Sequence, residues 1–160
     1  MDDLQKAIRN FYICYDLLNK LCWGGTLPPC RLGFSRRMRK AWANAGTDWQ
    51  IRFNVPLCAC TSDVHILMIM AHEMTHIRQF CQGRPGGHGK DFYDDMERIG
   101  ITGRINMSTR EKSCFAYALF MYSLKNINLA ESMKIINRNF VYKLLETSMF
   151  NQYKESVLCR

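Results

Sequence analysis

The sequence His72-Glu73-Met74-Thr75-His76 determines how this chain is organised. Residues four positions apart lie on one face of an α-helix, so the two histidines can direct their imidazole nitrogens at one metal ion. Glu73 directly follows the first histidine, which puts its carboxylate beside the metal, where it can take a proton from a water. Zinc lowers the pKa of such a water to about 7, so a weak base is sufficient near neutral pH.

The flanking residues predict a helix around this motif. Thr61, Ser62 and Asp63 offer an N-cap and a negative first turn, and Gly83 and Pro85 end the helical pattern. Apolar residues recur between them at helical spacing: Val64, Leu67, Met70, Ala71, Met74 and Ile77. A helix with this pattern is largely buried, and a metal would give its histidines and its glutamate the partners that burial requires.

A catalytic zinc site usually has three protein ligands and one open position. His65 lies seven residues before His72, about 10 Å away along the helix axis, so it cannot share a metal with it. The compact metzincin pattern is excluded, because Gln79 and Gln82 stand where its glycine and its third histidine would be. The third ligand must therefore come from beyond the helix.

Two residues beyond the helix are candidates for the third ligand. His88 follows a glycine-rich loop, residues 83–89, that can turn the backbone towards the motif. Glu97 is the alternative, because one group of zinc peptidases takes a glutamate from a downstream helix at a similar separation. The residues alone favour His88 and leave Glu97 open.

Length and composition indicate one ordinary globular domain. The chain has 160 residues, of which 48% are hydrophobic and 22% charged. No apolar run reaches the roughly 18 residues of a membrane span, and the acidic start Met1-Asp2-Asp3 is unlike a signal peptide. We therefore expect an intracellular protein that is not secreted and does not contact a membrane. Its eight cysteines would be reduced thiols; a second zinc site at Cys58 and Cys60 is the less favoured reading.

The formal net charge of +8 points to acidic partners. Between Arg31 and Lys40 there are five cations and no acid, and two tryptophans follow. Cations beside aromatic rings suit a nucleic-acid backbone with bases to stack. The predicted contacts are Arg36, Arg37, Arg39, Lys40 and Trp42. The ordinary alternative is a solvated basic loop.

Hydrophobic periodicity and capping residues predict the remaining elements. We expect helices at 3–22, 90–99, 109–125 and 129–150, and strands at 31–36 and 50–55. Ser108 with Glu111 and Asn128 with Glu131 have the spacing of capping boxes. The segment from Cys114 to Leu124 is so aromatic that it could instead be a strand.

The segment His88-Gly89-Lys90-Asp91-Phe92 resembles the H-G-x-x-F element of the SprT-like metalloprotease domain, the domain of the DNA–protein crosslink protease Spartan. Other short segments follow that family's order along the chain: Leu18-Asn19, Gly25-Thr26-Leu27-Pro28, Ser35-Arg36-Arg37-Met38, Ala45-Gly46 and Ile51-Arg52-Phe53-Asn54. The resemblance covers about residues 4–100 and is specific because these motifs occur together.

The resemblance implies one catalytic zinc ion held by His72, His76 and His88, with Glu73 as the catalytic base. It also implies cleavage of proteins trapped on DNA, stimulated by DNA that is single-stranded or has a disrupted duplex. Two other classes stay open. One is a DNA-binding adaptor with a non-catalytic zinc site, and the other is a general metallopeptidase without a nucleic-acid role.

We therefore expect an α+β fold with a compact zincin-like metalloprotease core, in which a small, mostly antiparallel sheet packs on the active-site helix. Residues 1–107 would form this core, and residues 108–160 a helical C-terminal extension packed on the same domain. The cysteine pairs of the zinc ribbon that many relatives carry after the core are not visible, so we expect a minimal, monomeric version.

Overall fold

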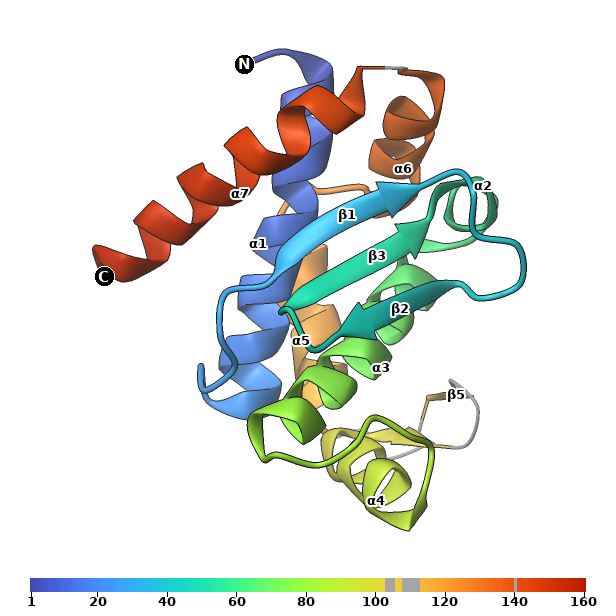
Figure 1. Ribbon diagram of the computed structural model, residues 1–160, viewed down its shortest axis with the longest axis vertical. Helices are drawn as coiled ribbons and strands as arrows, with labels where there is room; N and C mark the ends of the chain where they lie inside the picture. The colour runs from blue at the N-terminus through green and yellow to red at the C-terminus, as the bar shows by residue number, and fades with distance from the viewer. Residues whose placement is uncertain (103–105, 108–112, 140) are drawn as a thin grey trace.

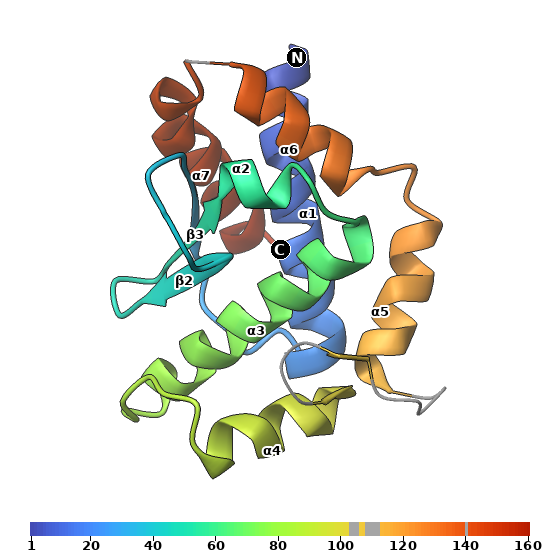
Figure 2. The same ribbon diagram turned by 90° about the vertical axis from the view of Figure 1, so that its right-hand side faces the viewer.

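The computed structural model describes residues 1–102, 106, 107, 113–139 and 141–160. Figure 1 shows a small sheet in front of the long helices α1 and α3, with α7 beside the sheet edge that β1 forms. Figure 2, turned by 90°, shows α5 and α6 on the far side of α1 from the sheet. The mixture of helices with a small three-stranded sheet agrees with the α+β prediction.

Helix α1 (Asp3–Trp23) begins and ends with well-formed caps. The Asp2 side chain accepts a hydrogen bond from the Gln5 backbone in a capping box, and Gly24 ends the helix in the left-handed region at φ 61°. Near its end, the buried Asn19 side chain donates to the carbonyl of Leu27 and accepts from its N–H, at 3.0 and 3.1 Å. This pair of bonds fixes the turn that leads into the sheet.

The sheet contains β1 (Arg31–Ser35), β2 (Ala43–Gly46) and β3 (Gln50–Asn54) in the order β1-β3-β2. β1 pairs with β3 in parallel, and β2 pairs with β3 in antiparallel fashion. The prediction of a mostly antiparallel sheet is therefore wrong for this sheet, which is mixed. β1 and β3 run in the same direction because the chain crosses the sheet and returns through β2 before it forms β3. A separate antiparallel pair joins β4 (Ile101–Thr102) to β5 (Asn106–Met107).

Strand β2 was not predicted from the sequence. Its residues, Ala-Asn-Ala-Gly, include no β-branched or aromatic side chain, so local propensity does not favour a strand. The predicted strand at 50–55 ends at Asn54, whose side chain caps the short helix α2 (Val55–Cys58).

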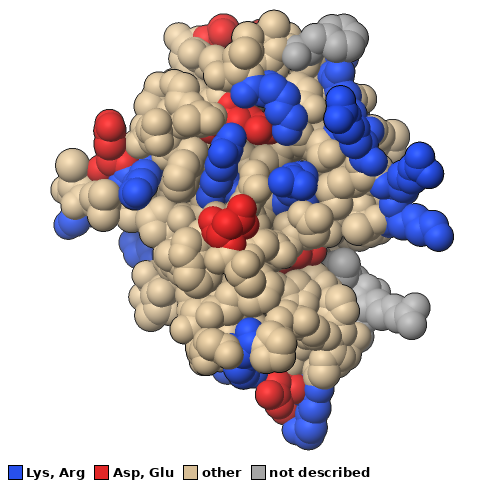
Figure 3. All heavy atoms as spheres, viewed as in Figure 1, with Lys and Arg blue, Asp and Glu red and all other residues tan. Residues whose placement is uncertain are grey.

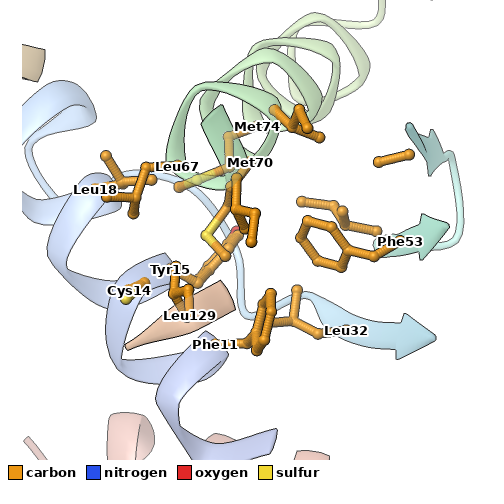
Figure 4. Packing of buried hydrophobic residues seen from close by; sticks show 14 of the residues in the cluster. Phe11, Cys14, Tyr15, Leu18, Leu32, Phe53, Leu67, Met70, Met74 and Leu129 are labelled. Carbon is orange, nitrogen blue, oxygen red and sulfur yellow. The ribbon is translucent and has the colours of Figure 1, made fainter. Parts of the chain in front are cut away.

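The predicted motif helix is α3 (Asp63–Cys81), with Ser62 as its N-cap, and α4 (Lys90–Ile99) matches the predicted helix at 90–99. Figure 4 shows the core that α3 shares with α1 and the sheet: Met70 and Met74 of α3 face Phe11 and Tyr15 of α1, and Phe53 of β3. All of these side chains are at most 1% exposed. The core therefore holds α3 against the sheet.

The C-terminal third consists of α5 (Cys114–Ser123), α6 (Leu129–Arg138) and α7 (Tyr142–Leu158). The aromatic segment from Cys114 is thus helical, capped by Ser113, and the predicted cap at Ser108 lies outside the described residues. Asn128 caps α6 as predicted. The single predicted helix at 129–150 is wrong, because α6 ends at Arg138 and α7 starts at Tyr142.

These helices share one hydrophobic cluster with the rest of the chain, through Phe115 of α5, Met133 of α6 and Met149 of α7. The boundary at 107/108 stays a prediction. In the described part of the chain, none of the helices combines the length and the hydropathy that a membrane crossing would require.

Candidate metal centre

Three histidines from two segments converge at the C-terminal half of α3. His72 and His76 lie one turn apart on this helix, and His88 reaches them from the loop between α3 and α4. The Nε2 atom of His88 lies 3.0 Å from Nε2 of His72 and 3.1 Å from Nε2 of His76. One ligand atom of each histidine lies within 4.8 Å of those of the other two. This arrangement could hold one metal ion.

The protonation of His72 and His76 also suits a metal. Burial, and to a smaller extent the neighbouring His76 and His88, lower the pKa of His72 to about 4. Burial also lowers the pKa of His76. Neutral imidazole is the form that coordinates a metal, and nitrogen donors of this kind suit zinc. The residues present therefore fit the zinc that was predicted.

Gln79 joins two parts of this centre, and it was not predicted as a site residue. Its Oε1 atom lies 2.8 Å from Nδ1 of His76, and its Nε2 donates to the carbonyl of Gly87 at 3.1 Å. The amide oxygen can accept only from a protonated Nδ1, which leaves Nε2 of His76 as a lone-pair donor for a metal. The available signal was its position three residues after His76, on the same helix face.

Phe92 of α4 lies under all three imidazoles. Its ring centroid is 4.7 Å from that of His72, 4.5 Å from that of His76 and 4.8 Å from that of His88. The ring is 1% exposed. These contacts give a physical reason for the phenylalanine four residues after His88. The Phe92 ring packs against the three imidazoles and so holds them in position.

Glu97, the alternative third ligand, lies on the exposed side of α4. Among the described residues, the group of side chains that could hold a metal contains His88 and not Glu97. His65 also lies apart from this group: its ring packs on the edge of Trp42, and its Nδ1 lies 2.7 Å from the Thr61 hydroxyl.

Glu73 faces the sheet from α3 and is 6% exposed. Burial raises the pKa of its carboxyl, a hydrogen bond from the backbone of Ala45 in β2 offsets part of this rise, and the resulting pKa is about 8. A cation held by the nearby imidazoles would lower the pKa of this carboxyl, because an opposite charge favours the ionised form. Its position suits a group that exchanges protons.

The centre opens into a cleft of about 500 Å³ between α3, the loop before α4 and strand β2. His72, Glu73, His76 and His88 all line it, together with Trp42 and residues 43–45. A larger groove of about 910 Å³ lies between α1, α5 and α7. Among the described residues, the group that could hold a metal lies in the smaller cleft, so chemistry and not size identifies the candidate site.

The predicted nucleic-acid residues lie in three different environments. Arg37, Arg39 and Lys40 are exposed on the loop between β1 and β2. Arg36 is half-buried: its guanidinium donates to the carbonyls of Ile136, Asn137 and Asn139 at the end of α6. Trp42 lines the cleft itself. The structure thus gives Arg36 a role in capping α6.

The loop that carries these residues is held in place by Asn54, which is 1% exposed. Its Nδ2 donates to the carbonyls of Met38 and Ala41, at 3.2 and 2.9 Å. Its Oδ1 accepts from the N–H of Leu57 at 3.4 Å. Sequence reasoning used this asparagine only as part of a motif, because its partners lie 13 to 16 residues away.

Comparison with known proteins adds one finding. No curated protein and no solved structure matches this chain. A family model does match: that of the SprT-like family, over residues 12–114. The matched region runs from α1 through the sheet, the motif helix and α4, and it contains all three histidines and Glu73. The chain belongs to the SprT-like family.

Proposed function

We propose that this chain is a zinc-dependent endopeptidase of the SprT-like type, which cleaves DNA-bound or DNA-crosslinked proteins and is stimulated by DNA. The observation that carries the proposal is the convergence of three Nε2 atoms beside the buried carboxyl of Glu73. A bound zinc ion would act as a Lewis acid on the scissile carbonyl and would lower the pKa of a water.

Four side chains of this protein would then take part directly, three as metal ligands and one in proton transfer. His72, His76 and His88 would hold the ion through Nε2, and Gln79 keeps His76 in the tautomer that this requires. Glu73 takes a proton from the attacking water at its carboxylate and delivers it to the leaving amine. Glu73 is 6% exposed, so its carboxyl is largely shielded from bulk water when it exchanges this proton.

The position of β2 supports an extended protein substrate. Asn54 N donates to Trp42 O at 2.8 Å, so Trp42 belongs to a hydrogen-bonded pair of the β2–β3 ladder. In an antiparallel ladder such pairs alternate, so the backbone groups of Ala43 and Ala45 point away from β3, towards the cleft. A substrate strand that pairs there uses backbone groups only, which supports broad specificity.

Exposed cations close to the cleft support the DNA part of the proposal. Arg37, Arg39 and Lys40 lie on the loop that continues into Trp42 and β2. A protein bound on DNA at this loop would lie near the scissile position. Such contacts would make affinity for DNA fall with salt concentration.

The test is cleavage of a histone by the zinc-loaded protein, with and without single-stranded DNA. We expect cleavage that DNA accelerates, and a loss of at least about 100-fold in Glu73→Gln, because general acid–base groups contribute 10²–10⁴-fold. The matched control is Glu97→Gln, which changes an exposed carboxylate of α4 and should keep full activity.

Each alternative function has its own outcome in this test. Equal histone cleavage by wild type and Glu73→Gln would remove the catalytic role of Glu73. Wild-type zinc binding without any cleavage would indicate a DNA-binding adaptor. Cleavage that DNA does not change would indicate a general metallopeptidase.

A further inference from the structure

The hairpin between β2 and β3 ends in a backbone position that tryptophan rarely occupies. Trp49 has φ 57° and is the one non-glycine residue at positive φ in the part of the chain that the structure describes. Its N–H donates to the carbonyl of Gly46 at 3.2 Å, which closes the turn, and its carbonyl accepts from the N–H of Arg31 at 2.8 Å. Glycine or asparagine is favoured in this left-handed region, so the backbone of Trp49 is strained where that of glycine would not be. Strain of this kind is found at functional positions.

The side chain of Trp49 is 36% exposed and lines a pocket of about 400 Å³. Pro28, Pro29 and Phe150 form further apolar walls of this pocket. A flat aromatic surface beside small apolar walls is the kind of surface on which a planar ring can stack.

The polar residues of the same pocket are Arg31, Lys154, Asp48 and Gln50. Arg31 is 41% exposed and donates to the Thr147 hydroxyl at 3.1 Å, and Lys154 is exposed on α7. The carboxylate of Asp48 packs against Gly46, so closely that a Cβ at position 46 would collide with Asp48 Oδ1. Two cations therefore stand beside the aromatic surface, and Asp48 is directed into its own turn. Nη2 of Arg31 also lies 4.0 Å from Oε2 of the buried Glu146.

The pocket lies at one end of a basic surface. Leu32 and Phe34 of β1 and Ile51 and Phe53 of β3 face the core, so the alternate residues, including Arg31 and Arg52, face the other side. Figure 3 shows that Lys and Arg predominate over Asp and Glu on this face. This surface follows β1 from Trp49 towards the basic loop at 37–40. A strand of five residues such as β1 is about 17 Å long.

We infer that this surface binds a single-stranded nucleic acid, with one unpaired base stacked on Trp49 and the phosphates beside Arg31, Lys154 and Arg52. Base–aromatic stacking and backbone-tracking cations are together the features of a site for single strands. A duplex has no free base to place on the ring. The inference deepens the proposed function and rests on it, because it locates the DNA that would stimulate cleavage.

The experiment measures the Kd of fluorescent oligonucleotides by anisotropy at one fixed salt concentration. The probes are a single-stranded oligothymidylate, an abasic single strand of equal length and a duplex. Trp49→Asn removes the ring and keeps a residue that tolerates positive φ. We expect it to weaken oligothymidylate binding about tenfold, in the range for one stacked base, and to leave abasic binding unchanged.

Three further variants separate stacking from other effects. Trp49→Phe should restore most of the affinity for oligothymidylate, because it keeps an aromatic ring. Lys154→Gln should weaken binding of both single strands alike and reduce the salt slope by about one, as loss of a phosphate contact does. Tyr117→Asn, which removes an exposed aromatic ring of α5, is the matched control and should bind both strands like wild type.

Two results would overturn the inference, and they can be told apart. If wild type binds oligothymidylate and DNA stimulates cleavage, but Trp49→Asn binds like wild type, the stacking site is wrong and the proposed function stands. If wild type binds neither single strand and DNA does not change cleavage, the DNA part of the proposed function fails as well.

Discussion

The two edges of the three-stranded sheet differ in what covers their backbone groups. At the β1 edge, side chains occupy the backbone donors: the Tyr12 hydroxyl accepts from the N–H of Leu32 at 3.1 Å, and Glu146 Oε1 accepts from that of Phe34 at 2.9 Å. At the β2 edge, backbone groups face the cleft that contains the histidines. An uncovered edge is a template for another strand, so covering β1 leaves β2 as the edge where a strand can be added.

Helix α7, which lies outside the matched family region, supplies part of the cover on the β1 edge. Glu146 belongs to α7, which lies beside β1 (Figure 1). Its carboxylate is 4% exposed and also accepts from Lys143 at 2.9 Å. In this account α7 closes one edge of the sheet, and the metal centre uses the other.

We call the β1 edge the closed edge and the β2 edge the open edge. Removing the Glu146 carboxylate at the closed edge should give the largest change, a loss of stability. Glu146→Ala leaves the Phe34 N–H buried without its acceptor, which costs about 3 kcal/mol, since the lost acceptor is charged. In a chain of this size the melting temperature would then fall by about 6–12 °C, as measured by circular dichroism. Glu146→Gln keeps an oxygen acceptor and should lose less. A melting temperature unchanged in both variants would mean that this cap does not stabilise β1.

The next largest expected effect is a loss of zinc affinity at the metal centre, which lies beside the open edge. Gln79→Leu removes the acceptor of His76 Nδ1 and the bond to Gly87. We expect zinc affinity to fall about 10–100-fold, the usual effect of losing a hydrogen-bond partner of a ligand. Competition with a chelator measures this directly. Gln82→Leu, at the position directly after the last residue of α3, is the control, and equal zinc affinity in both variants would refute the role of Gln79.

Closing the open edge should lower activity and leave the fold intact. Ala43→Pro removes a backbone donor that points away from β3, a position where edge strands tolerate proline. Loss of one substrate hydrogen bond corresponds to about a tenfold decrease in kcat/KM. Histone cleavage measures the loss, and bound zinc and the melting temperature serve as controls. Full activity in this variant would show that substrates do not pair with β2.

The smallest effect should come from the second cap of the closed edge. Tyr12→Phe removes the hydroxyl that accepts from Leu32, and it keeps the ring that stacks on Tyr153 at 4.7 Å. The expected loss is about 1 kcal/mol, measured by urea unfolding, with cleavage unchanged. A loss of cleavage without a loss of stability would reverse the assignment of the two edges.

The features that sequence reasoning predicted are those that local patterns encode. The apolar stripe and the cap at Ser62 predicted α3, and the spacing of His72 and His76 predicted that they would share a face. The glycines after α3 allowed His88 to return to it, and the structure shows that it does.

The features that it missed depend on distant partners. β2 forms by pairing with β3, and its own residues, Ala-Asn-Ala-Gly, do not predict that pairing. α6 ends without a glycine or proline. The Arg36 guanidinium, which follows the end of β1, donates to the terminal carbonyls of α6 in place of a local cap. The roles of Gln79 and Asn54 likewise appear only when the loops are in place.

The most direct test of the account is the metal content of the purified protein after dialysis, measured by mass spectrometry. We predict one zinc ion per chain in wild type and in His65→Ala, whose ring packs on Trp42. His88→Ala should lose the ion, because it removes one of the three converging nitrogens. A wild type without metal, or a His88→Ala variant that keeps its zinc, would contradict the account.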